Sequence, residues 1–409
     1  MPPGLQPSEI AGAVVLDPPG APAVDVDVAC EEALEAPWGV SLERLARRGD
    51  RVVILVPDAT RDTPRASQVG AVLSRLRGAG VAAEDIVAVV ATGAHASGPP
   101  PPGGFGCDAL GRPARIHDGR SEALRPMGRM PSIRARFLPG FLESESARVA
   151  ARVPGSALRL RAAATAGRAR VLRVAPEVAD ADLVVSLGAV VPHPIAGFAG
   201  GAKMIFPGVA DARSIRENHA LRMHPSVRRG AIEPNLAREH LEAAVRLVGA
   251  RRFCLDVLPR PGGGVLGAVA GDPDLAVREG ARRLRPALEV AKDRPFDVVV
   301  CVVEGPAGRT VYQATKGAAA AAPLVAPDGA VVVVAGCEEG VGDLPGARRI
   351  VALGLRTALP PRARLLLVSG AEAPSVRRVG FEPRRSLDET VAEMRAARVA
   401  VLPRALHVL

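Results

Sequence analysis

The sequence is short of several kinds of residue, and each shortage argues against a class of protein. Aromatic residues make up 2% of the 409 residues, so base-stacking surfaces are not expected, and neither is a nucleic-acid partner, despite a net charge of +10. The five cysteines include no Cys-x-x-Cys pair, which argues against a cysteine zinc site and favours reduced thiols in a cytoplasmic protein. Long apolar runs and a signal-peptide pattern are missing too, so we expect no membrane segment.

Lysine is scarce, and its positions are informative. Of 53 lysines and arginines only three are lysine, at Lys203, Lys292 and Lys316. Because arginine occupies almost every position where a positive charge suffices, a remaining lysine is expected to act as an amine. Lys316 also follows the only tyrosine, Tyr312, and one of the few glutamines, Gln313. This clustering of rare residue types favours an enzyme site, and the positive charge suits a small anionic substrate.

The hydrophobic pattern predicts an α/β fold with two domains, each a largely parallel or mixed sheet flanked by helices. The chain is too long for one ordinary core, and apolar runs alternate with helical periodicity. Strands are expected at 52–56, 86–90, 183–187, 253–258 and 265–270, and again at 298–303, 330–335 and 365–369. Residues 23–28 alternate as an extended segment would, and residues 97–180 show no clear period.

The expected domain boundaries follow from this alternation. Residues 1–275 would form the catalytic domain, 276–295 a connector helix, and 296–397 the second domain. Residues 398–409 would add a strand or return to the first domain. The active site is expected in the cleft between the two domains.

Polar residues follow the ends of three expected strands, at the sheet edge where ligands of parallel α/β folds bind. The segment 191–219 is unusually rich in glycine, which lets backbone N–H groups approach a ligand. A single loop histidine is more often structural, and Asp58 with Arg61 could be a local ion pair in a turn. The candidates are Asp58, Thr60 and Arg61 after the first strand, His95 after the second, and His193, Gly200, Gly201, Lys203 and His219 after the third.

Five motifs occur in an order that points to a known family. They are DATR at 58–61, TGAH at 92–95, PHPIAGFAGGAKMIFPG at 192–208, ENH at 217–219 and YQATKG at 312–317. With these motifs the chain resembles the nickel-pincer-nucleotide-dependent lactate racemase family over most of its length. The third motif is long and specific, whereas the others are short.

The resemblance implies a function and a role for each candidate. The enzyme would be an isomerase, a racemase or epimerase that inverts C2 of a small anionic 2-hydroxy acid by removing and returning a hydride. Its cofactor, nickel in a pyridinium-3-thioamide-5-thiocarboxylic acid mononucleotide, would be loaded by cofactor-biosynthesis proteins. The implied roles are covalent attachment at Lys203, nickel binding by His219, cofactor contacts by Asp58, Thr60, Gly200, Gly201 and Tyr312, paired acid/base chemistry by His95 and His193, and substrate binding by Arg61, Gln313 and Lys316.

The chain departs from the family pattern near the implied pocket. Ala96 and Ser97 follow the TGAH motif where the family usually has arginine, and residues 304–308 lack an aspartate that is common there. These departures leave open which 2-hydroxy acid is the substrate. They also leave open a cofactor-binding homologue without activity. A nicotinamide-dependent dehydrogenase is a third possibility, but no G-x-G-x-x-G turn directly follows an expected strand.

Overall fold

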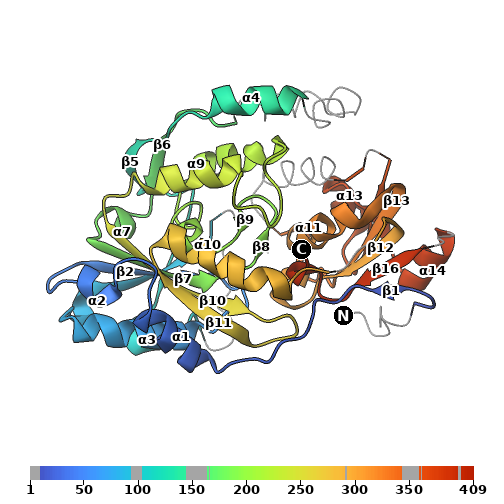
Figure 1. Cartoon of the computed structure of the whole chain (residues 1–409). Helices are drawn as coiled ribbons and strands as arrows, with labels where there is room; N and C mark the ends of the chain where they lie inside the picture. The colour runs from blue at the N-terminus through green and yellow to red at the C-terminus, as the bar shows by residue number, and fades with distance from the viewer. Residues whose placement is uncertain are drawn as a thin grey trace.

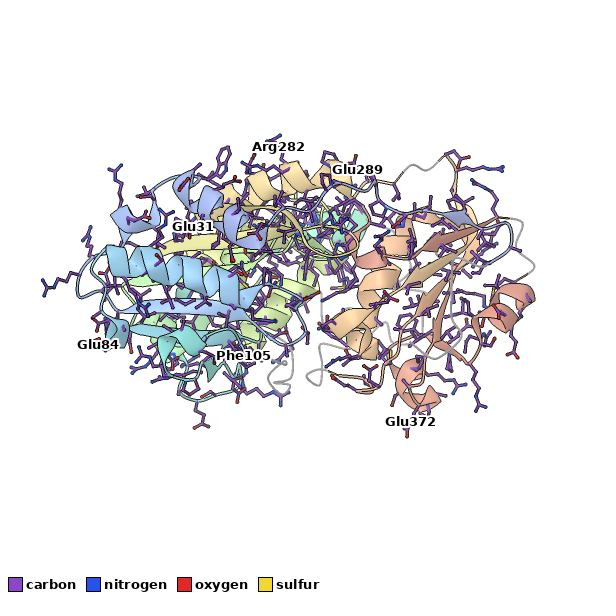
Figure 2. The ribbon with its side chains drawn as sticks, turned by 90° about the horizontal axis from the view of Figure 1, so that it is seen from below. Glu31, Glu84, Phe105, Arg282, Glu289 and Glu372 are labelled. Atoms are coloured by element: carbon purple, nitrogen blue, oxygen red, sulfur yellow. The ribbon has the colours of Figure 1, made fainter. Side chains whose placement is uncertain are left out.

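Two six-stranded sheets form the framework of the molecule. The computed structural model describes residues 10–93, 104–143, 164, 166–290, 293–342, 359–360, 362–394 and 398–409. The sheets lie side by side and helices flank both of them (Figure 1). Seen from below in Figure 2, Glu84 marks the outer end of the first sheet and Glu372 lies with the second. The predicted α/β fold class is confirmed.

The first sheet has the strand order β11-β10-β7-β2-β3-β4. All neighbouring pairs are parallel except β10 with β11. Runs of Val, Ile and Leu buried on both faces explain the central strands, and all five strands predicted for this part of the chain are present. The strands are β2 (Val52–Pro57), β3 (Ile86–Ala91), β4 (Arg115–Ile116), β7 (Leu183–Ala189), β10 (Arg251–Pro259) and β11 (Val265–Gly271).

Helices cover both faces of this sheet. Helices α1 (Val26–Glu35), α2 (Leu42–Leu45) and α3 (Arg65–Gly78) share one apolar cluster with the strands, and α8 (Ala212–Ala220) and α9 (Leu236–Val245) belong to the cluster on the other face. The extended segment predicted at 23–28 is wrong from residue 26 onward. Asp25 accepts the N–H groups of Asp27 (2.9 Å) and Val28 (3.0 Å), and this N-cap starts α1.

The second sheet has the order β1-β16-β12-β13-β14-β15 and is parallel throughout. The strands predicted at 298–303, 330–335 and 365–369 correspond to β12, β13 and β14. Helices α11 (Val311–Ala321), α13 (Ala373–Arg378) and α14 (Leu387–Glu393) accompany them. The strands are β1 (Val14–Val15), β12 (Phe296–Val302), β13 (Val325–Val334), β14 (Arg364–Val368), β15 (Glu382–Arg384) and β16 (Val399–Leu402).

The chain crosses between the sheets at positions that the sequence pattern did not indicate. The N-terminal β1 pairs with β16 in the second sheet, although residues 1–275 were expected in the first domain. The expected connector 276–295 overlaps α10 (Pro273–Leu284), which packs on β10 and β11 and so belongs to the first sheet. The last residues contact both parts of the molecule. Strand β16 pairs with β12 in the second sheet, and Arg229, from the first part of the chain, donates to the carbonyls of Leu406 (2.6 Å) and Val408 (3.0 Å). The domain boundaries stay a prediction.

Short elements occupy the described part of residues 97–180, which explains why no period was visible there. Strand β5 (Arg125–Arg129) pairs antiparallel with β6 (Val171–Val174), and α4 (Arg134–Glu143) and α7 (Pro176–Ala179) lie beside this hairpin (Figure 1). Downstream, β8 (Pro192–His193) and β9 (Gly197–Phe198) form a second short hairpin. Within the described ranges, no helix has both the length and the apolarity that crossing a membrane requires.

Candidate active site

Charged groups from both sheets meet in one cluster. The pKa of His193 in β8 is lowered by burial and then by the charges of Lys203, Lys316, Arg61 and His219. Lys316 belongs to α11 beside the second sheet, whereas the other four follow strands of the first. The structure therefore brings these five predicted residues together. The remaining predicted acid/base residue, His95, lies outside the described residues.

Hydrogen bonds between its own residues and the start of α3 stabilise the loop after β2. The Asp58 carboxylate accepts the Thr60 N–H (2.7 Å) and the Thr60 hydroxyl (2.5 Å). Arg65, in the first turn of α3, donates to the carbonyls of Pro57 (3.1 Å), Asp58 (2.6 Å) and Arg61. Asp58 is buried, so its charge acts directly on the amines nearby. The sequence analysis missed Arg65, because nothing local distinguishes it from the other arginines.

The glycines before Lys203 allow a close approach of backbone segments. Gly200 and Gly201 have φ angles of +92° and +53°, in the left-handed region that favours glycine. A Cβ on Gly201 would collide with the carbonyl of Pro273. The Gly201 N–H donates to the Asp256 carboxylate at 2.7 Å and so is already engaged. Packing accounts for these two glycines, and their predicted contact with a cofactor stays a prediction.

Asp256 anchors the segment that carries Lys203. It lies in β10 with no exposed surface, and burial raises its pKa to about 6. One carboxylate oxygen binds the Gly201 N–H, and the other has no hydrogen-bond partner among the described residues. The sequence analysis missed this residue. The available signal was a carboxylate in the middle of an otherwise apolar strand.

The two lysines of the cluster hold perturbed amines. Burial, followed by the charge of Arg61, lowers the pKa of Lys203 to about 7, and Asp58 opposes the shift. Burial together with Arg61 and Lys203 lowers the pKa of Lys316 well below its usual value. In the part of the chain that the structure describes, neither amine has a hydrogen-bond partner. At neutral pH the Lys203 amine is therefore partly unprotonated and able to act as a nucleophile.

His193 has a defined tautomer in this arrangement. Its Nδ1 atom accepts the N–H groups of Ile195 (3.1 Å) and Ala196 (3.0 Å). A nitrogen that accepts two N–H groups carries no proton, so the neutral ring has its proton on Nε2. The lowered pKa keeps the ring neutral at pH 7. In this form His193 offers a hydrogen-bond donor at Nε2.

Helix α11 supplies the second side of the site. The Thr310 hydroxyl accepts the Gln313 N–H at 3.2 Å and caps the helix. Gln313 is buried, and its side-chain oxygen has no partner among the described residues. Tyr312 lies near Arg222, a buried arginine of the 3-10 turn η5 (Leu221–Met223), whose pKa burial lowers to about 10. Arg222 makes no hydrogen bond to a described residue and was missed, because one arginine among so many carries no signal.

His219 lies in the last turn of α8, whose first turn is capped by Asp211. The described residues contain no group of three or more His, Cys, Asp and Glu side chains that could hold a metal.

Three other histidines make local contacts. His117 bonds to the Ala210 carbonyl (3.0 Å), His224 to the Ser226 hydroxyl (2.8 Å), and His240 to the Asn218 amide (3.2 Å). Asn218, one of the two asparagines, also donates to the Ala237 carbonyl at 2.9 Å and so ties α8 to α9. Asn218 therefore has a structural role next to His219.

Comparison with known proteins points to one family. Residues 5–100 and 161–230 match the family model of the lactate racemase N-terminal domain. Lactate racemases from Thermoanaerobacterium thermosaccharolyticum and Lactiplantibacillus plantarum are each 27% identical to the chain over 321 residues. In sequence the chain is therefore similar to the lactate racemase family. The alignments cover 76% of this chain and 66% of each relative, so the chain spans just under two thirds of their length.

Solved structures extend the similarity of fold over nearly the whole chain. The lactate racemase apoprotein from T. thermosaccharolyticum superposes with a TM-score of 0.76 at 22% identity, covering 97% of this chain and 94% of that one. A crystal structure of a protein from Thermotoga maritima gives a TM-score of 0.66 at 15% identity, covering 93% and 96%. At these identities the structures establish the fold.

Proposed function

We propose that this chain is a member of the lactate racemase family and a racemase or epimerase that inverts C2 of a small anionic 2-hydroxy acid. The observation that carries the proposal is the Lys203 amine, with a pKa of about 7, in a cluster with Arg61, His193 and Lys316. The curated relatives are named lactate racemases, which supports an isomerase. The two departures near the pocket are the reason to extend the substrate beyond lactate.

The residues present fit the nickel-pincer nucleotide. A partly unprotonated amine at Lys203 suits covalent attachment, and His219 offers an imidazole to a metal that takes its other donors from the cofactor. The excess of cations near Lys203 suits a ligand that carries a phosphate. When bound, this group supplies the acceptor for the substrate hydride. The roles of Asp58, Thr60, Gly200, Gly201 and Tyr312 in holding it are part of the proposal.

Arg61 and Lys316 hold the substrate carboxylate. Both are cationic groups of the cluster, and Lys316 comes from the second sheet, so binding draws on both sides of the site. An anion placed between them would remove part of the repulsion that lowers the pKa of Lys316 and His193. The side-chain oxygen of Gln313, which has no partner among the described residues, is available to accept a hydrogen bond from the substrate hydroxyl.

His95 and His193 serve as proton acceptors, one for each hand of the substrate. Each enantiomer places its hydroxyl differently, and imidazole can take up and return a proton near neutral pH. For His193 this role requires a change of conformation. In the present tautomer Nε2 already carries a proton, so the ring can accept one there only after its own proton has moved to Nδ1. Nδ1 must first release the N–H groups of Ile195 and Ala196. We expect substrate binding to turn the ring.

The test is intact mass and nickel content of the full chain, produced together with a biosynthetic system for the cofactor. We expect a mass increase equal to the cofactor, mapped to the peptide that contains Lys203, with about one nickel per chain. Lys203→Arg, which keeps the charge but cannot be acylated in the same way, should show neither. An unmodified parent chain under these conditions would contradict the proposal.

A cofactor-binding homologue without racemase activity is the second candidate, because the substitutions near 96 and 304–308 could remove turnover while leaving loading intact. The loaded protein should be incubated with single enantiomers of several 2-hydroxy acids and followed by chiral chromatography. Racemisation of any of these acids would show that the protein is an active racemase and would exclude the inactive homologue. The five buried, free cysteines fit the cytoplasm as the location, where cofactor-biosynthesis proteins would act on the chain.

A further inference from the structure

A strongly basic groove lies away from the candidate active site, between the β5–β6 hairpin and the start of α8. In Figure 1 this hairpin is at the end of the molecule opposite the second sheet. The groove has a volume of about 1120 Å³, enough for a small organic ligand. Seven arginines line it: Arg120, Arg129, Arg168, Arg170, Arg173, Arg213 and Arg216.

Few negative charges offset these arginines. The lining carboxylates are Glu122 and Asp211, which leaves an excess of five positive charges. Asp211 is committed to the protein, because it accepts the N–H groups of Arg213 (3.0 Å), Ser214 (2.9 Å) and Arg173 (3.2 Å). Glu122 is exposed.

Two of the seven guanidinium groups are occupied. Arg170 forms an ion pair with Glu217 at 2.6 Å, and Arg173 donates to the Leu124 carbonyl at 3.2 Å. The other five, at positions 120, 129, 168, 213 and 216, form no ion pair or hydrogen bond through their side chains with a residue that the structure describes. All five are exposed to solvent and line the groove.

The chemistry of the lining defines the ligand. Five exposed guanidinium groups in one concavity raise the local positive potential and so favour a bound anion, and the planar guanidinium donates two parallel hydrogen bonds to phosphate oxygens. No aromatic residue lines the groove, so it has no platform for stacking a base. We propose that the groove binds a phosphate chain, an anion with at least two adjacent phosphate groups. This inference does not depend on the proposed function.

The experiment is isothermal titration of the full chain with sodium tripolyphosphate in 0.15 M NaCl. Arg168→Ala and Arg216→Ala are combined in the groove variant. The control combines Arg44→Ala and Arg48→Ala, two exposed arginines near α2 that remove the same charge outside the groove. We expect one binding site, a roughly tenfold or larger loss of affinity in the groove variant, and a change of less than about twofold in the control.

Further arms identify the source of the phosphate chain. ATP that binds more tightly than tripolyphosphate would indicate a nucleotide, and ATP that binds more weakly would indicate a free polyphosphate. Either result supports a phosphate site in the groove. Equal losses in both variants, or no binding by the parent at this salt concentration, would overturn the proposal, because the attraction would then be diffuse. Tighter binding of a single-stranded oligonucleotide than of tripolyphosphate would overturn it in favour of a nucleic-acid surface. A second groove variant, Arg129→Ala with Arg120→Ala, should repeat the loss.

Discussion

The two sheets differ in the kind of side chain that they bury. The described residues between 50 and 279 bury charged groups, among them Asp58, Glu217, Arg222, Arg238 and Asp256. The described residues between 296 and 402 bury four polar side chains, and the charged group that burial perturbs in this part is the Lys316 amine. Three of these four lie at α11 or its cap, and this helix also carries Lys316. Because burying a charge costs free energy of folding, we expect this cost to be larger in the part of the chain that forms the first sheet.

Part of this buried charge is structural. Arg238, with no exposed surface, donates to Glu242 (2.7 Å) and to the Phe198 carbonyl (3.1 Å), and Arg278 binds the same glutamate at 2.9 Å. The charge of Arg238 still acts on the active site: it adds to the effect of burial that lowers the pKa of Lys203, and it opposes the effect of burial that raises the pKa of Asp256. We therefore predict that catalysis depends mainly on residues of the first sheet and its loops. The second sheet would take part through helix α11, which carries Lys316.

The largest effect is expected at Lys203. Lys203→Met should abolish cofactor loading completely, because methionine has no amine. It should also stabilise the unloaded protein, because it removes a buried cation next to Arg61 and Lys316. Intact mass measures the first effect and urea denaturation the second.

The same variant tests the pKa of Lys203 through the pH dependence of stability. Its folded pKa of about 7 lies below the usual 10.5, so between these values the unfolded chain binds more protons. The free energy of unfolding of the parent should therefore rise as pH increases from about 7 to 10.5. In Lys203→Met this rise should be smaller. An identical slope in both proteins would show that the amine is not perturbed.

His193→Gln separates two roles of this histidine. Glutamine can accept the two backbone N–H groups and donate a hydrogen bond, but it cannot take up a proton. If His193 is a base, turnover of the loaded enzyme should fall by about 10²- to 10⁴-fold in both directions, with nickel content unchanged. Chiral assays started from each enantiomer give the two rates. Near-normal rates would assign His193 a donor role, as its present hydrogen bonds indicate.

A smaller loss is expected when the contribution of the second sheet is removed. Lys316→Met should load cofactor and nickel normally and lose roughly a hundredfold in kcat/KM, because the substrate carboxylate loses one of its two cations. Lys316→Arg should recover part of this loss. If loading fails in the methionine variant, Lys316 belongs to the cofactor site instead.

No effect on turnover is expected from the core of the second sheet. Leu366 in β14 is fully buried, and Leu366→Ala should lower the free energy of unfolding by about 2–5 kcal/mol. Its kcat/KM should equal that of the parent at a temperature where both are folded. A changed kcat/KM would mean that the second sheet positions the site more directly than its buried residues indicate.

The sequence alone determined the strands and the identity of several key residues. Runs of Val, Ile and Leu located β2, β3, β7, β10 and β11 to within two residues, because burial on both faces leaves a local signature. In the second sheet, β13 begins at Val325, well before the expected residue 330. The scarcity of lysine singled out Lys203 and Lys316, and motif order indicated the family. The α1 helix was misjudged because its cap, Asp25, outweighs a weak alternation.

Only the tertiary structure decided which residues support these groups. Asp256 reaches Gly201 across 55 positions, and Arg222 meets Tyr312 from beside the other sheet. The pairing of β1 with β16 joins opposite ends of the chain. Such contacts depend on strand order and on how the two sheets face each other, which no local pattern encodes. The perturbed amine of Lys203 has the same origin, because its pKa is set by burial and by charges brought from distant parts of the chain.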